Sequence, residues 1–259
     1  MKKVIVFLFL LTSLKSLTGQ EYFNRKWERC SVDSAFYFVN TDKTGGNSHM
    51  VRFKQEGRFS KDYAIYKTDD FKTGEFTRFN KKGDTLMHMF YKDGKLNGKH
   101  RLWKERGHLY RITNFVDDTE SGIALYFFPN GQLSARYEVD NGKTIMREYW
   151  NEDGSELNDP DKANVKPRFL GKDYNAFTGW VASRLVYPNE LRGLRIKGVV
   201  MVSFKITEKG YVRDVKALKS PHYLLAAEAV RVIENSPAWT PGISHNQVSE
   251  ITFCIPVIF

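Results

Sequence analysis

The chain has 259 residues, of which 41% are hydrophobic and 27% charged. This composition excludes disorder throughout and suffices for one large or two ordinary domains with apolar cores. The net charge of +10 comes from Lys and Arg residues that alternate with acids instead of forming a run. Such a charge indicates a solvated basic surface, suited to peripheral association with anionic lipid or polysaccharide of an envelope. Nucleic acid is not expected as a partner, because an exported protein rarely meets it.

The chain begins with the pattern of a secretory signal peptide. Lys2 and Lys3 precede an apolar run, residues 4–11, after which polar residues return. The apolar core, residues 4–14 at its longest, has eleven residues, whereas a helix needs about 20 to span a bilayer. We therefore expect residues 1–19 to be removed and the mature protein to be exported, to the periplasm or the outer envelope.

A period of 24 residues runs through the middle of the chain. The segments GEFTRFNKKG, GKHRLWKERG and GIALYFFPNG begin at Gly74, Gly98 and Gly122, and in each an aromatic residue stands four positions before the second glycine. Similar aromatic–glycine pairs on both sides extend the array to about five copies between residues 50 and 157. Each copy reads as a strand, a tight turn and a second strand.

The turns and the residues between them predict hairpins. Three dipeptides are of the type that adopts positive φ at both central positions of a type I′ turn: Asn130-Gly131, Asn141-Gly142 and Asp153-Gly154. Between the first two, apolar residues alternate with polar ones, namely Leu133, Ala135, Tyr137 and Val139. Because one hairpin cannot bury its own aromatic face, stacked neighbours must supply the core.

The pattern G-x-x-x-aromatic-aromatic-x-x-x-G-x-L resembles MORN-variant repeats, which include the YwqK-type antitoxin repeats. The resemblance implies an antiparallel β-meander over residues 20–157, whose exposed faces bind a partner or act as a spacer. The segment that opens the mature chain is rich in aromatic residues, namely Phe23, Trp27, Phe36, Tyr37 and Phe38. We interpret it as packing for the sheet, with a carbohydrate platform as the alternative.

Residues 158–171 contain two prolines, many polar residues and no period, so we expect a linker. The next region, residues 172–259, changes period. One helical face is predicted before Pro188 by Phe177, Trp180, Val181 and Leu185. A strand and its hairpin partner follow, the first strand with an inward face made of Val200, Val202, Phe204 and Ile206.

A second helix and a closing strand complete this region. The helix has one apolar stripe made of Leu225, Ala226, Ala229, Val230 and Ile233. The strand has an inward face made of Ile251, Phe253, Ile255, Val257 and Phe259. The predicted order is helix, two strands, helix, strand, which gives an α+β protein of two domains.

Several motifs of residues 176–259 are similar, in this order, to the C-terminal domain of TonB, the energy-transducer family. They are Tyr187-Pro188, Gly198 at the start of a strand, Gly210 in the hairpin turn, Lys219-Ser220, Trp239-x-Pro241-Gly242 and Pro256-Val257-x-Phe259. The resemblance implies a small αββαβ domain and strand addition: a partner peptide, such as the N-terminal segment of a TonB-dependent outer-membrane receptor, pairs with the sheet edge during energy-coupled transport.

The closing strand is predicted to lie at that edge. Proline is tolerated in a sheet mainly where its missing N–H faces an edge, and Pro256 lies within this strand. The expected partner-binding residues are Glu250, Thr252, Cys254, Pro256 and Ile258. Two alternatives remain: Pro256 only protects the edge against aggregation, or the repeats form the binding surface of a scaffold or adhesion protein and the C-terminal domain is structural.

No pattern indicates an enzyme. The six histidines show no metal-ligand spacing, and we expect each of them at the surface or in a turn. The tripeptide GKT at residues 142–144 lacks the upstream glycine of a phosphate-binding loop, because Tyr137 stands there. We therefore expect no catalytic, cofactor or metal site. The spacing of Cys30 and Cys254 demands no disulfide, and nothing indicates the oligomeric state.

Overall fold

The computed structural model describes residues 20–41, 48–55, 58–104 and 107–259. The expected signal peptide lies outside the described residues. The chain divides into two compact units. The repeat unit comprises Met1–Leu125 and Tyr137–Met146, and the C-terminal unit comprises Tyr126–Arg136 and Arg147–Phe259.

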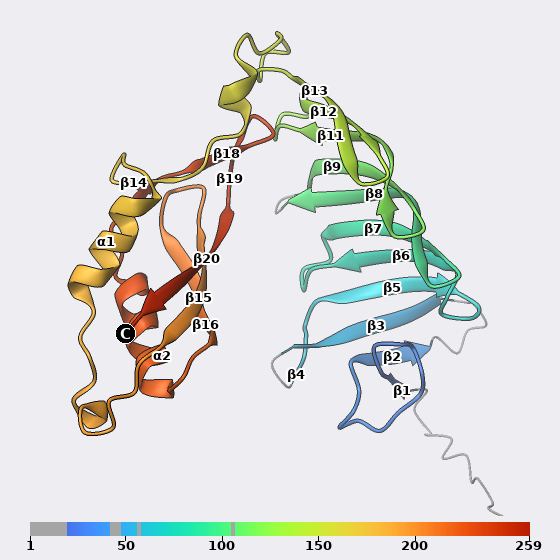
Figure 1. The fold of residues 1–259 in the computed structure, drawn as a ribbon. Helices are drawn as coiled ribbons and strands as arrows, with labels where there is room; N and C mark the ends of the chain where they lie inside the picture. Colours follow the sequence, from blue (N-terminus) through green and yellow to red (C-terminus); the bar gives the residue numbers. More distant parts are fainter. Residues whose placement is uncertain (1–19, 42–47, 56–57, 105–106) are drawn as a thin grey trace, which may run out of the picture. The chain divides into compact units, whose positions relative to one another are not determined.

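The repeats form an antiparallel β-meander (Figure 1). Its strand order is β1-β2-β3-β5-β6-β7-β8-β9-β11-β12-β13, with β4 paired to β3 and β10 to β9. The bounds are β1 (Gln20–Phe23), β2 (Tyr37–Thr41), β3 (Ser48–Gln55), β4 (Arg58–Phe59), β5 (Tyr63–Thr68), β6 (Gly74–Phe79), β7 (Thr85–Lys92), β8 (Lys95–Lys104), β9 (His108–Val116), β10 (Thr119–Glu120), β11 (Gly122–Phe127), β12 (Leu133–Asp140) and β13 (Lys143–Tyr149). The predicted meander is confirmed, whereas the resemblance to MORN-variant repeats stays a prediction.

The turns of the meander correct part of the sequence prediction. Asn141 and Gly142 both have positive φ, 48° and 78°, as a type I′ turn requires. In the other two dipeptides only the glycines, Gly131 (87°) and Gly154 (85°), have positive φ. The N–H of Gly131 donates to the carbonyl of Phe128 at 2.9 Å. These turns are three-residue loops, in which a type I turn is followed by one residue in the left-handed region. That residue is the glycine, and the residue before it keeps a negative φ.

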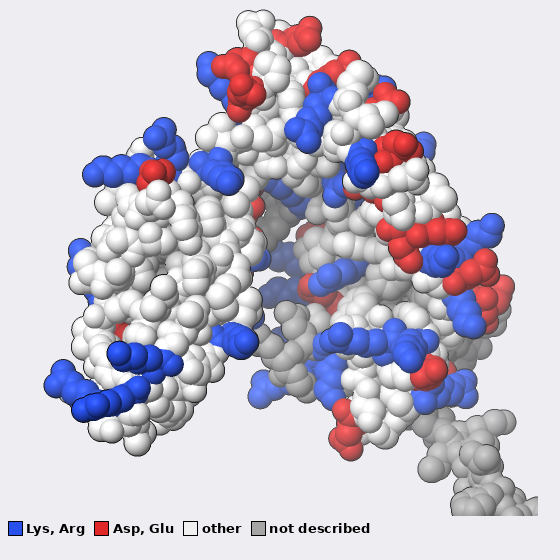
Figure 2. Space-filling view, viewed as in Figure 1, with Lys and Arg blue, Asp and Glu red and all other residues white. Residues whose placement is uncertain are grey.

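One face of the repeat sheet buries a core of apolar side chains. Its fully or nearly buried members are Phe23, Val39, Val51, Ala64, Tyr66, Phe76 and Met89. Trp27 and Tyr37 pack against this core, so the packing interpretation of the opening aromatic segment is confirmed for Phe23, Trp27 and Tyr37. On the visible face of the repeats, basic side chains are intermixed with acidic ones (Figure 2).

The C-terminal unit is an α+β domain with the predicted order of helix, two strands, helix and strand. Its elements are η1 (Pro160–Ala163), β14 (Arg168–Phe169), α1 (Tyr174–Arg184), η2 (Asn189–Leu191), β15 (Val199–Ile206), β16 (Val212–Lys219), α2 (Tyr223–Glu234), β17 (Trp239–Thr240), β18 (Gly242–Ser244), β19 (Gln247–Ser249) and β20 (Ile251–Ile258). The described strands form a three-stranded sheet, β16-β15-β20, and the pairs β14-β17 and β18-β19. Within residues 158–171, Ala163 and Phe169 are buried.

The core of this unit lies between the sheet and the helices. All four predicted inward residues of β15 have an exposed fraction of 0%. In α2 the buried residues are Leu225, Ala229, Val232 and Ile233, and the predicted Ala226 packs partly buried against the same core. The buried face includes Val232, which the sequence did not predict. Trp239 lies among aromatic rings of β14, α1, β15 and β20, with centroid distances of 5.2 Å to Phe169 and 4.6 Å to Phe177.

Side chains at the helix ends explain where α1 and α2 begin. The carboxylate of Asp173 accepts a hydrogen bond from the N–H of Ala176 (3.3 Å), and His222 Nδ1 accepts one from Leu224 (3.2 Å). Neither helix, nor any other in the described residues, combines the length and apolarity that crossing a bilayer requires.

Candidate functional site

The closing strand β20 lies at the edge of the three-stranded sheet (Figure 1). Within the described ranges it pairs with β15 alone, and β16 occupies the other side of β15. The register of β15 and β20 runs without a shift from Val199 opposite Ile258 to Ile206 opposite Ile251. The prediction of an edge strand, made from Pro256, is therefore confirmed.

The hydrogen bonds at the chain end fix which backbone groups face the open edge. Gly198 and Phe259 exchange two bonds, with N···O distances of 3.3 and 3.0 Å. In an antiparallel pair, residues that exchange bonds alternate with residues that point away from the partner. The N–H groups of Thr252, Cys254 and Ile258 therefore point away from β15, toward the open edge.

The backbone nitrogen of Pro256 also points away from β15. Because this nitrogen would not donate to β15 in any residue, the proline costs the sheet no hydrogen bond. Carbonyl groups at all four positions, residues 252, 254, 256 and 258, point outward by the same alternation. The open edge of β20 thus offers three donors and four acceptors in the spacing of a β-ladder, interrupted once at Pro256.

The side chains of β20 follow the same alternation. Ile255 and Val257 are buried, with exposed fractions of 1% and 2%. Four of the five predicted binding residues, Thr252, Cys254, Pro256 and Ile258, lie together on the exposed face of the sheet. A partner strand would therefore meet their backbone at the edge and their side chains on one face.

The fifth predicted residue, Glu250, lies outside the edge ladder. It precedes β20, and its carboxylate forms ion pairs with Lys205 (3.1 Å) and Arg213. Lys205 also pairs with Asp214 at 3.2 Å. Hydrogen bonds from the ammonium group, first to Glu250 and then to Asp214, raise the pKa of Lys205. Glu250 is thus held by a charge cluster beside the start of the edge strand, which the sequence pattern did not indicate.

The opposite edge of the sheet is irregular. The pairing of β15 with β16 has two register shifts, one next to Met201 and one after Ser203. Asp214 in β16 has a φ of 54°, in the left-handed region. Bulges of this kind interrupt the ladder and hinder the pairing of a further strand. Of the two edges, β20 is therefore the one whose backbone is suited to an incoming strand.

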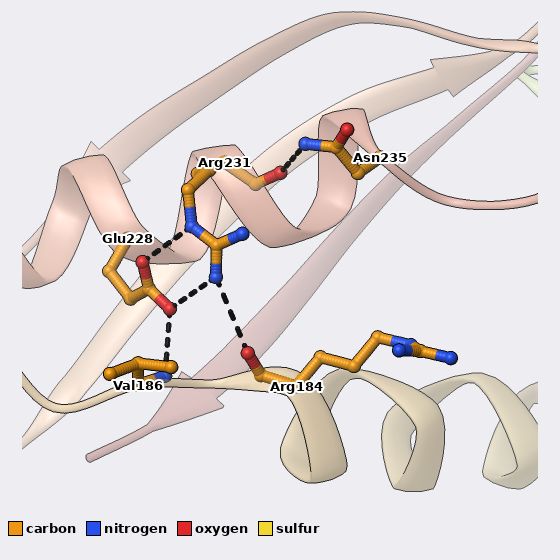
Figure 3. A network of polar contacts seen from close by, with 5 residues as sticks. All are labelled: Arg184, Val186, Glu228, Arg231 and Asn235. Atoms are coloured by element: carbon orange, nitrogen blue, oxygen red, sulfur yellow. Dashed lines mark hydrogen bonds and ion pairs between the residues drawn. The ribbon is translucent and has the colours of Figure 1, made fainter.

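A polar network fixes the connection from α1 to β15 (Figure 3). The carboxylate of Glu228 in α2 accepts hydrogen bonds from the N–H of Val186 (2.7 Å) and from both Nε and a terminal nitrogen of Arg231 (2.7 Å each). Arg231 also donates to the carbonyl of Arg184 at 3.4 Å. The bonds from Arg231, followed by the bond from Val186, hold the pKa of Glu228 below its ordinary value.

The network explains the position of the Tyr187-Pro188 motif. The hydroxyl of Tyr187 donates to the carbonyl of Ile196 at 2.7 Å, which closes the loop before β15. Pro188 precedes η2 and starts its turn. The motif therefore fixes the backbone conformation of the connection between α1 and β15. Neither residue lies in β20.

The other titratable groups of the described residues form no cluster suited to a metal ion. No group of three or more His, Cys, Asp and Glu residues is placed to hold a metal ion there. Cys30 and Cys254 are free, and Cys254 is exposed. His88 and His100 lie in the repeat strands β7 and β8, where each is half-buried with one buried ring nitrogen, so the expectation of a surface position is wrong for these two. Burial in the sheet, followed by the charge of Arg111, lowers the pKa of His100.

Comparisons with known proteins agree with the motifs of the C-terminal unit. A family model, described as Gram-negative bacterial TonB protein C-terminal, matches residues 183–259. This part of the chain is therefore a TonB C-terminal domain, from a family that is non-catalytic. The N-terminal region has no family assignment. No curated protein matches the chain.

One of the solved structures that match is similar to about a third of the chain. It is the NMR solution structure of TonB-CTD from Helicobacter pylori, with 25% sequence identity over 36% of this chain and 92% of that chain, and a TM-score of 0.28.

Proposed function

We propose that this protein is a non-enzymatic component of the cell envelope that binds a partner peptide by strand addition to β20. The observation that carries the proposal is the outward orientation of the N–H groups of Thr252, Cys254 and Ile258 on a strand with one neighbour. The buried inner face keeps this strand ordered, so a partner meets a pre-formed edge.

The partner proposed is the N-terminal segment of a TonB-dependent outer-membrane receptor. Proteins with a TonB C-terminal domain typically bind such receptors, which supports this choice and a role in energy-coupled transport. The same family supports a periplasmic or other cell-envelope location. The pattern of residues 1–19 supports export.

A peptide titration with proline variants tests the edge. A labelled receptor-type N-terminal peptide is titrated against the mature chain and against Thr252→Pro and Ile258→Pro. Each substitution removes one outward donor and leaves the bonds to β15 in place. A lost hydrogen bond costs about 0.5–1.5 kcal/mol, so we expect affinity to fall by about two- to tenfold, and further where the ring obstructs the partner strand.

The matched controls are Thr252→Ala and Ile258→Ala, which change the same side chains and keep the N–H groups. They should bind the peptide more tightly than the proline variants at the same positions. Equal affinity of each proline variant and its alanine control would contradict pairing at this edge.

The exposed thiol of Cys254 gives a second test, because cross-strand neighbours lie close enough for a disulfide. In a Cys30→Ser background, a single cysteine is moved along the peptide and disulfide formation with Cys254 is measured. Side chains of a strand alternate between faces, so cross-linking should peak at every second peptide position. A disulfide yield that is the same at odd and even peptide positions would contradict strand addition.

A further inference from the structure

The repeat unit contains a pocket that the proposed function does not use. Its volume is about 340 Å³. Of its twelve lining residues, seven are aromatic and two are methionine, while the charged ones are Arg25 and Arg78 and none is acidic. The register places Phe53 of β3, Tyr66 of β5 and Phe76 of β6 on one face of the sheet. The pocket is therefore an apolar hollow with positive charge beside it.

Trp27 reaches this pocket from a turn in which the repeats elsewhere use glycine. Residues 24–28 make the same backbone bonds as residues 80–84, a turn between β6 and β7. In the first turn the N–H of Asn24 donates to the carbonyl of Glu28 (2.9 Å), and the N–H of Trp27 donates to the carbonyl of Asn24 (3.1 Å). In the second turn the N–H of Asn80 donates to the carbonyl of Asp84 (3.0 Å), and the N–H of Gly83 donates to the carbonyl of Asn80 (3.0 Å). The asparagine Oδ1 accepts from the third and fifth residues in both turns. Trp27, with a φ of 61°, occupies the position of Gly83, with a φ of 93°.

A second aromatic residue of the pocket also has a positive φ. Phe71 has a φ of 57°, and its N–H donates to the hydroxyl of Thr68 at 2.9 Å. Bulky residues rarely adopt the left-handed region, because the side chain crowds the following carbonyl. Trp27 stacks on Phe71, with ring centroids 5.3 Å apart, and on Tyr37, 4.1 Å apart. Two strained residues thus build one aromatic wall, and such strain tends to collect at ligand sites.

The two arginines have few polar partners among the residues that the structure describes. Within the described residues Arg25 forms no ion pair, and its guanidinium lies over the ring of Phe36 at 4.7 Å. Arg78 has one ion pair, to Asp62 at 3.5 Å, and its Nε is buried without a hydrogen-bond partner in the structure. The side chain of Arg78 is nevertheless 36% exposed and lines the pocket, so an anion there can accept hydrogen bonds from its accessible guanidinium N–H groups, and such charge-assisted bonds are strong.

Three phenols add neutral donors to the wall. Burial raises the pKa of Tyr37, Tyr66 and Tyr91. All three residues line the pocket, and the rings of Tyr66 and Tyr91 lie with their centroids 6.2 Å apart. At neutral pH they are protonated and can each donate one hydrogen bond.

These features select among ligand classes. A cation is disfavoured by Arg25 and Arg78, because no acidic residue lines the pocket. A neutral sugar would need open aromatic faces, and the indole of Trp27 is already stacked by neighbouring rings. We infer that the pocket binds a small amphipathic carboxylate, with its aliphatic or aromatic body among the rings and methionines and its carboxylate group on Arg25 and Arg78.

Calorimetric titration of the mature chain tests the charge requirement. The probes are octanoate and 4-phenylbutanoate, each compared with the alcohol of the same skeleton. We expect at least one carboxylate to bind at least tenfold more tightly than its alcohol. The ratio between the two acids distinguishes an aliphatic from an aromatic ligand. Absence of binding, or equal binding of acid and alcohol, would overturn the inference.

Variants locate the site. Arg25→Gln and Arg78→Gln should each weaken carboxylate binding at least fivefold. Arg52→Gln is the matched control, because Arg52 is exposed and precedes Phe53 in β3, which places it on the opposite face of the sheet. Loss of binding in the control as well, or in none of the variants, would refute this location.

Trp27→Gly tests the wall itself. Glycine is the residue that the equivalent turn of residues 80–84 uses, so the turn should form without strain. We expect the circular dichroism spectrum of the variant to keep its β-sheet signal while carboxylate binding falls more than tenfold, and Trp27→Phe to retain part of the binding. Full binding by Trp27→Gly with an intact spectrum would show that this wall serves no ligand.

Discussion

Gly210 lies so close to Trp239 that a Cβ on the glycine would stand 2.0 Å from the carbonyl oxygen of Trp239. The Trp239 N–H also donates to the carbonyl of Gly210 at 2.8 Å. The turn between β15 and β16 is therefore held against the strand that follows α2. The glycine turn and the Trp-x-Pro motif, which are separate in the sequence, form one contact in the fold.

This contact predicts a large effect of Gly210→Ala. The residue has a φ of 82°, which alanine adopts at a cost of about 1–2 kcal/mol, and the added Cβ also meets backbone. We expect the free energy of unfolding to fall by about 3 kcal/mol or more, as for other substitutions that force the backbone to move. Chemical denaturation measures this change.

Gly131→Ala is the matched control, because Gly131 has nearly the same φ, 87°, and an added Cβ would meet nothing within 4 Å. Its cost should be limited to about 1–2 kcal/mol of backbone strain. If the free energy of unfolding falls equally in the two variants, the close approach of Gly210 to Trp239 contributes nothing to the cost of Gly210→Ala.

The Glu228 network predicts a dependence of stability on acid pH. The folded-state pKa of Glu228 lies below its ordinary value of 4.5. A carboxylate with a lowered pKa stabilises the fold above the unfolded-state pKa, and this contribution is lost as pH falls through the folded-state value. Glu228→Gln should therefore reduce stability at pH 7 and lose less stability than the unmodified chain on acidification below pH 4.5. Thermal unfolding at a series of pH values measures both effects.

Glu234→Gln provides the comparison for this experiment, because Glu234 ends the same helix and is exposed. Its stability should follow the unmodified chain across the acid range. An acid profile of Glu228→Gln that parallels the unmodified chain would mean that the bonds to Val186 and Arg231 contribute no pH-dependent stability.

A large part of the fold could be predicted from the sequence, because the spacing of apolar residues within a segment indicates whether it forms a strand or a helix. The alternation in β15 and β20 predicted the buried faces, and Pro256 predicted the edge. Trp27 could not be recognised as a glycine substitute, since its turn is defined by hydrogen bonds and not by composition. The linker expected at residues 158–171 includes Phe169, because a strand of two residues shows no period in the sequence.

Phe169 carries a prediction about the start of the C-terminal domain. Its exposed fraction is 2%, and its ring lies 5.2 Å from both Phe177 and Trp239. Removing a buried phenylalanine side chain costs about 3–5 kcal/mol. A fragment of residues 158–259 should therefore be more stable than one of residues 172–259, and Phe169→Ala in the longer fragment should lose most of the difference. Equal urea midpoints for the two fragments would remove Phe169 from the core.

A buried hydrogen bond predicts that the last repeat and the β18–β19 hairpin unfold together. Gln247 Nε2 donates to Ser134 Oγ at 2.6 Å, and the two residues have exposed fractions of 7% and 0%. Ser134→Ala leaves the amide of Gln247 without this acceptor, which should lower the free energy of unfolding by about 1–3 kcal/mol. The double variant, Ser134→Ala with Gln247→Leu, removes both polar groups. It should therefore recover part of that loss. A double-mutant cycle by urea denaturation measures the coupling. Additive effects would mean that this hydrogen bond does not couple β12 to the hairpin.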